Sequence, residues 1–120
     1  MRIAIVEIVD RGVANKERLW LKVLANADLC YFVVFDTTYT SPNSISNRQR
    51  HAYWFAPKQV AAGDHVILYT RDGAPTEKRN PDGSTTHFFY WGLNRTVWNS
   101  IDDCAVLLEI NSWQTSKYRQ

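Results

Sequence analysis

The stretch FFYWGLNRTVWNSIDDCAVLLEINSW, residues 88–113, contains two apolar runs separated by a polar turn at residues 99–103. Three of the five tryptophans lie in it, namely Trp91, Trp98 and Trp113. Large flat side chains at this density either fill a core or form a binding face. Because aromatic and β-branched residues favour strands, the stretch predicts a strand on each side of the turn.

Short apolar and β-branched runs also occur along the rest of the chain, with turn residues between them. One of them, residues 19–25, would permit a helix, but seven residues are too few for a stable one. The predicted strands are residues 2–9, 19–25, 29–35, 51–55, 65–70, 86–91 and 104–110. Many short strands and no convincing helix predict an all-β fold, an antiparallel β-sandwich.

Two long polar segments interrupt this pattern, at residues 36–50 and 71–85. Pro42 prevents regular strand pairing in the first, and Asn80-Pro81-Asp82-Gly83 carries strong turn chemistry in the second. We predict that both are loops. Loops of this length in a small domain are either functional or mobile.

The composition is that of one soluble globular domain spanning residues 1–120, with a frayed tail at residues 114–120. The net charge of +2 is too balanced to indicate a nucleic-acid binder by itself. The chain has neither a signal-like N-terminus nor a run that could span a membrane, which predicts a cytoplasmic protein. In a cytoplasmic protein Cys30 and Cys104 are expected to be reduced thiols in the core rather than a disulfide, and their separation excludes a CxxC metal or redox motif.

Two segments carry a resemblance to a known family. The first is Phe55-Ala56-Pro57 followed by VAAGDHVILY at residues 60–69, and the second is Tyr90-Trp91-Gly92 followed by VWNSIDDCAVLL at residues 97–108. They resemble the lamin tail domain, which often has glycine where this chain has Asp102. The resemblance implies an immunoglobulin-like sandwich of about seven to nine strands. It also implies a recognition or tethering module, without catalytic residues, whose partners include proteins and DNA.

The polar turn at residues 99–103 has a structural explanation. Asp residues in turns accept hydrogen bonds from backbone amides, and we expect Asp103 to do so. Trp98 and Asn99 are expected to belong to the same corner of the sandwich. Asp102 and Asp103 are adjacent acids, so in a strand they would point to opposite faces rather than share a metal.

Catalytic chemistry has little support in this sequence, which contains no Walker loop, GxSxG, GxGxxG or HExxH motif. His51, His65 and His87 each lie at or near a predicted strand start. We expect them to be solvated or structurally hydrogen-bonded, and we predict no metal and no cofactor. The alternative is a small hydrolase or nuclease built from the histidines and Asp103.

Basic side chains gather around the two long loops, and a domain of this size cannot easily bury sixteen aromatic residues. We therefore predict an exposed apolar patch, which usually marks a contact surface. The predicted binding residues are Arg48, Arg50, Tyr53, Lys58, Arg71, Lys78, Arg79, Phe89 and Trp91. They predict a non-catalytic interaction or adaptor module that binds a protein partner or itself. The alternative is a nucleic-acid-binding module that uses the basic loops.

Overall fold

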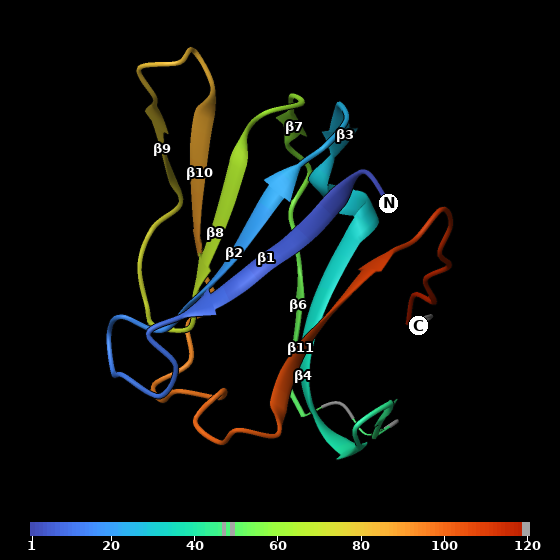
Figure 1. Ribbon diagram of the computed structural model, residues 1–120. Helices are drawn as coiled ribbons and strands as arrows, with labels where there is room; N and C mark the ends of the chain where they lie inside the picture. Colours follow the sequence, from blue (N-terminus) through green and yellow to red (C-terminus); the bar gives the residue numbers. More distant parts are fainter. Residues whose placement is uncertain (47, 49, 119–120) are drawn as a thin grey trace.

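The computed structural model describes residues 1–46, 48 and 50–118. Its secondary structure is almost entirely strand (Figure 1). The elements are β1 (Ile3–Val9), β2 (Arg18–Val23), β3 (Ala27–Asp28), the 3-10 helix η1 (Leu29–Tyr31), β4 (Phe32–Ser41), β5 (Ser44–Ile45), β6 (Ala52–Trp54), β7 (Gln59–Val60), β8 (His65–Tyr69), β9 (Thr76–Arg79), β10 (Thr85–Tyr90) and β11 (Asp103–Glu109).

The strands form two main sheets, and the predicted all-β sandwich is confirmed. One sheet has the order β1-β2-β8-β10-β9, which follows from right to left across Figure 1. The other has the order β11-β4-β5, with β6 also paired to β4. A short ladder of β3 and β7 completes the described part of the chain.

One strand pair departs from the predicted antiparallel arrangement. β10 pairs with β8 in parallel, from Thr86 opposite His65 to Tyr90 opposite Tyr69. The reason lies in the second long polar segment, which forms β9 and then turns back through residues 80–84 into β10. β9 therefore takes the outer position, and the chain re-enters the sheet in the direction of β8.

The structure also corrects the predicted strand boundaries. The run at residues 29–35 begins as η1, because the Asp28 carboxylate caps it by accepting the Cys30 amide at 3.0 Å. The strand that follows, β4, extends through Ser41 into the first predicted loop. Each predicted loop contains a short exposed strand, β5 or β9. These strands lie at sheet edges, so they lack the apolar alternation that would predict them.

The core lies between the two main sheets. It receives alternate side chains from each, including Leu19, Leu21 and Leu68 on one side and Phe32 and Val34 on the other. Burial of such aliphatic and aromatic surface is the main favourable term in folding. The side chain of Trp98 is fully buried there, and its indole N–H donates to the Cys104 carbonyl at 3.1 Å.

A buried carboxylate fixes the segment that crosses from β10 of one sheet to β11 of the other. Glu17 is only 1% exposed. Its Oε2 accepts the Gly12 amide at 2.8 Å and the Trp98 amide at 3.2 Å, and its Oε1 accepts the Val97 amide at 2.8 Å. The loop between β1 and β2 is thereby joined to the segment that carries Trp98. The sequence placed Glu17 in an unremarkable polar connection, so this role was missed.

The turn before β11 has the contact expected of Asp103. Its Oδ2 accepts the Ser100 amide at 2.9 Å, and its Oδ1 accepts the Thr38 hydroxyl of β4 at 3.3 Å. Arg11 donates to the carbonyls of Ser100 and Asp103, which ties the turn to the β1–β2 loop. Gly12 has φ +70 beside Asn99, so Asn99 packs against the same corner.

We predict that Glu17→Gln lowers the free energy of unfolding by about 1–3 kcal/mol, because an amide side chain offers one acceptor oxygen where the carboxylate offers two. Urea denaturation measures the change. Glu7→Gln, an exposed position on β1, is the matched control and should change stability little. Equal stability of the two variants would show that the Glu17 contacts contribute nothing.

Candidate interaction surfaces

The three aromatic residues predicted to bind all pack against the core. Phe89 is 5% exposed, and its ring packs edge-on against Phe55 at 5.2 Å. Tyr53 contacts the same Phe55 ring at 4.9 Å, and Trp91 lies 5.7 Å from Trp98. Phe89 is thus buried, whereas Tyr53 and Trp91 are partly buried against the core, and their role as contact residues stays a prediction. Successive side chains of a strand point to opposite faces of the sheet. The sequence alone does not decide which of the two alternating groups faces the core.

Three exposed aromatic side chains lie together on the outside of the sheet that contains β4, β6 and β11. Tyr31, Trp54 and Trp113 are 40%, 49% and 45% exposed. The Trp113 ring lies 5.6 Å from Tyr31 and 5.1 Å from Trp54, and the Trp54 indole donates to the Cys30 carbonyl at 2.7 Å. The alternation of residues 51–55 already placed Trp54 opposite Tyr53 and Phe55.

The register of the sheet extends this aromatic group into a broader apolar surface. Leu108, Val33 and Trp54 form one row across β11, β4 and β6. The next outward row is Val106, Phe35 and Ala52. We call the surface formed by these two rows together with Tyr31 and Trp113 the outer aromatic face. All eight of its side chains are uncharged.

Toward the C-terminal end of β4, the segment that contains Ser46 and Arg48 covers the same side of the sheet. The Thr37 hydroxyl donates to the carbonyls of Ser46 and Arg48, and Thr37 is 2% exposed. The outer aromatic face therefore ends at this cover, while Trp54 and Leu108 remain exposed at its centre.

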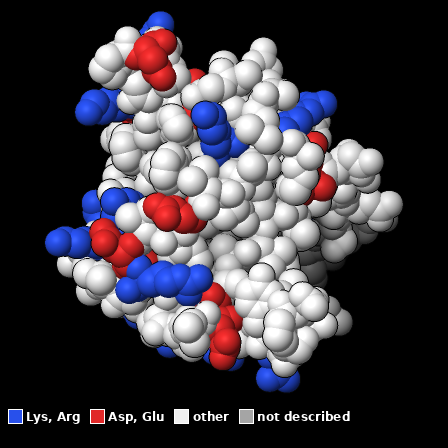
Figure 2. Space-filling model, in the orientation of Figure 1, with Lys and Arg blue, Asp and Glu red and all other residues white. Residues whose placement is uncertain are grey.

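The predicted basic residues do not form one surface. Arg48 and Arg50 follow β5, whereas Lys78 and Arg79 lie on β9 at the edge of the other sheet. The Lys58 ammonium pairs with Glu77 at 2.9 Å, which offsets its charge. On the face shown in Figure 2, Lys and Arg side chains are scattered and often lie beside Asp or Glu.

Arg71 is the predicted basic residue with the most defined surroundings. Its guanidinium carbon lies 4.7 Å from the centre of the Tyr69 ring and 5.0 Å from that of Tyr90. The two tyrosine rings are stacked, 5.4 Å apart. Arg71 also donates from Nε to the Asn15 carbonyl and from Nη1 to the Asp72 carbonyl, both at 3.0 Å. Stacking and two hydrogen bonds hold this cation in one orientation.

The three histidines occupy separate places, and each has a hydrogen-bonded partner. His65 accepts the Trp20 indole N–H at 3.0 Å. His51 contacts Asp36 through Nδ1 at 3.1 Å, and His87 contacts Asp64 through Nε2 at 2.9 Å. Within the described residues, no group of three or more His, Cys, Asp or Glu side chains could hold a metal ion.

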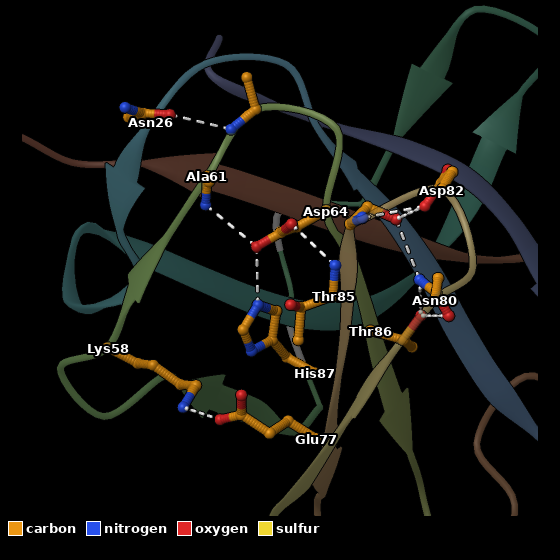
Figure 3. Close-up of polar contacts among 12 residues, drawn as sticks. Asn26, Lys58, Ala61, Asp64, Glu77, Asn80, Asp82, Thr85, Thr86 and His87 are labelled. Atoms are coloured by element: carbon orange, nitrogen blue, oxygen red, sulfur yellow. Dashed lines mark hydrogen bonds and ion pairs between the residues drawn. The ribbon is translucent and has the colours of Figure 1, made fainter.

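The pair of Asp64 and His87 is the most buried of these and is drawn in Figure 3. Asp64 also accepts the Ala61 amide at 3.1 Å and the Thr85 amide at 3.0 Å, so it links the turn before β8 to the start of β10. Desolvation by burial acts to raise the pKa of Asp64. The hydrogen bonds from His87, Ala61 and Thr85 outweigh it and hold that pKa below its ordinary value of 3.8.

The two cysteines are free thiols, as predicted, although only Cys104 is buried and Cys30 is half-buried. Desolvation raises the pKa of both, and the adjacent Asp28 carboxylate raises that of Cys30 further. Such thiols are poor nucleophiles.

Across the described residues, no helix has the length and apolar character needed to cross a membrane.

Comparison with protein-family models, with curated proteins and with solved structures gave no match. The resemblance to the lamin tail domain thus rests on the two quoted sequence segments.

We predict that Asp64 makes stability pH-dependent in the acid range. Its folded-state pKa is lowered, so its contribution is complete above the unfolded-state pKa and is lost as the pH falls through the folded-state value. The difference in urea midpoint between the parent protein and Asp64→Asn should therefore shrink below about pH 4. Asp102→Asn, in an exposed turn, gives the baseline. A difference that stays constant from neutral to acid pH would contradict this role.

Proposed function

We propose that this domain is a non-catalytic interaction module and that it associates with a second copy of itself through the outer aromatic face. The supporting observation is the exposure of Tyr31, Trp54 and Trp113 side by side on one sheet. Contiguous exposed apolar surface on a soluble domain usually marks a contact site. The resemblance to the lamin tail domain, a recognition module, points the same way.

The chemistry of the face favours a second copy over a partner of different character. Its eight side chains are uncharged, so they provide no charge pattern that would select a complementary charged protein. A two-fold interface requires only one self-complementary patch. Two such faces would bury aromatic and aliphatic surface against surface of the same kind.

The centre of the face is also rigid, which lowers the entropic cost of association. Val33, Leu108 and Trp54 project from paired strands rather than from loops. The hydrogen bond from the Trp54 indole to the Cys30 carbonyl further fixes the ring. Tryptophan at the centre of an interface commonly contributes a large share of the binding energy.

Analytical ultracentrifugation over a wide range of concentrations tests this proposal. We expect reversible dimerisation, and we expect Trp54→Ser to raise the dissociation constant by at least about tenfold. Ile101→Ser is the matched control, because Ile101 is 93% exposed but lies in the turn before β11.

A parent protein that stays monomeric throughout would overturn self-association. If the dimers of the Trp54→Ser and Ile101→Ser variants have the same dissociation constant, the contact lies on another surface. Either variant must first show the circular dichroism spectrum of the parent protein, so that a loss of folding is recognised.

We place this module in the cytoplasm, where the two free thiols Cys30 and Cys104 fit the reducing conditions.

Nucleic-acid binding is the second candidate, and the stack of Arg71 on Tyr69 and Tyr90 is the observation in its favour. Aromatic rings and cations at one place suit single-stranded nucleic acid. Its support is weaker because the other predicted basic residues are dispersed.

If the chain binds an oligonucleotide, the affinity should fall steeply with salt and should fall again in Arg71→Glu. Fluorescence anisotropy with a labelled single strand measures both, with Arg79→Glu on the exposed edge strand β9 as the control. A site at Arg71 would be rejected if the affinity for the oligonucleotide did not depend on salt. It would also be rejected if both variants weakened that affinity equally.

A further inference from the structure

Two arginine side chains from different segments line one pocket at the end of the five-stranded sheet. The pocket has a volume of about 300 Å³ and is lined by Arg71, Arg95, Asp72 and neutral residues of segments 14–15, 70 and 93–96. These segments meet at the lower left of Figure 1, where β8 and β10 end. Their backbones are joined by hydrogen bonds from Leu93 to Thr70 and from Gly92 to Arg71.

We propose that this pocket binds the phosphate group of a small phosphomonoester. A guanidinium presents N–H donors in a planar fork that matches the oxygens of phosphate. Two guanidiniums and one carboxylate leave the pocket with a net positive charge. Its volume lies at the lower limit for ligand pockets, which suits a small molecule.

Arg71 is oriented for this role before any ligand arrives. Its guanidinium packs on Tyr69 and Tyr90, and its Nε and Nη1 donate to carbonyls at the pocket margin. A guanidinium has five N–H donors, and these contacts use two of them. A cation held in this way loses little further freedom when it binds an anion.

Arg95 is oriented from the opposite side by a chain of polar contacts that begins in the core. The Asp36 carboxylate is buried and contacts His51 Nδ1 at 3.1 Å, and Arg95 Nη2 lies 3.1 Å from His51 Nε2. A guanidinium only donates, so Nε2 must accept and the imidazole proton lies on Nδ1, facing Asp36. Asp36 and His51 are therefore positioning residues for Arg95.

Neutral polar groups around the two arginines add hydrogen-bonding capacity for the ester oxygens. Asn15, Asn94 and Thr96 all line the pocket. Asp72 is the only acidic residue in the described lining, so the two guanidiniums outweigh its repulsion, and the net positive charge attracts a dianion more strongly than a monoanion.

Isothermal titration calorimetry with ribose 5-phosphate, ribose and inorganic phosphate tests the site on the full chain. We expect ribose 5-phosphate and phosphate to bind and ribose not to bind. Arg95→Gln removes a charged hydrogen-bonding group, and Arg71→Lys keeps the charge but loses the planar fork and its stacking, so each should weaken ribose 5-phosphate binding by about tenfold. Arg79→Gln, on the exposed edge strand β9, should leave it unchanged.

Absence of ribose 5-phosphate binding, or equal affinity in all three variants, would overturn the proposal. Binding of a single-stranded oligonucleotide without binding of ribose 5-phosphate would overturn it in favour of nucleic acid. Trp54→Ser lies outside the pocket and should retain ribose 5-phosphate binding, so the phosphate site and the self-association face can fail independently.

Discussion

The Glu17 carboxylate accepts hydrogen bonds from three backbone amides, and the closure of the sandwich depends on them. Leaving buried amides without acceptors is costly, so the loop after β1 and the segment before β11 must remain together. That segment inserts Trp98 between the sheets, where the indole bonds Cys104 at the start of β11. One carboxylate thus fixes the passage of the chain from β10 of the first sheet to β11 of the second.

The same crossing arranges the two candidate sites. Residues 93–96, which precede Trp98, form one wall of the arginine pocket and carry Arg95 to His51, which precedes β6 of the other sheet. β11, which follows the turn, supplies Leu108 and Val106 to the outer aromatic face. A contact surface and a polar pocket therefore share a rigid support while lying on different parts of the molecule, which allows them to act separately.

Much of the fold was accessible from sequence because local chemistry governs it. Apolar runs predicted the central strands, and the Asp103 turn formed its expected amide contact. The edge strands β5 and β9 were missed because β5 has only two residues and β9 is polar on both sides, so both are specified by their neighbours. The candidate site was predicted less well. Arg71 was among the residues predicted to bind. Arg95 was not, because only the fold brings residues 71 and 95 to one pocket.

The sequence by itself determined that the chain forms short strands with an excess of aromatic side chains, and that some of these must remain outside. Tertiary structure decided which ones. Alternation requires Tyr53 and Trp54 to face opposite ways, but the choice between them follows from register and from the second sheet. The same holds for Phe89 and Tyr90. The buried carboxylates Glu17, Asp36 and Asp64 likewise acquired their roles from partners distant in sequence, which no local pattern encodes.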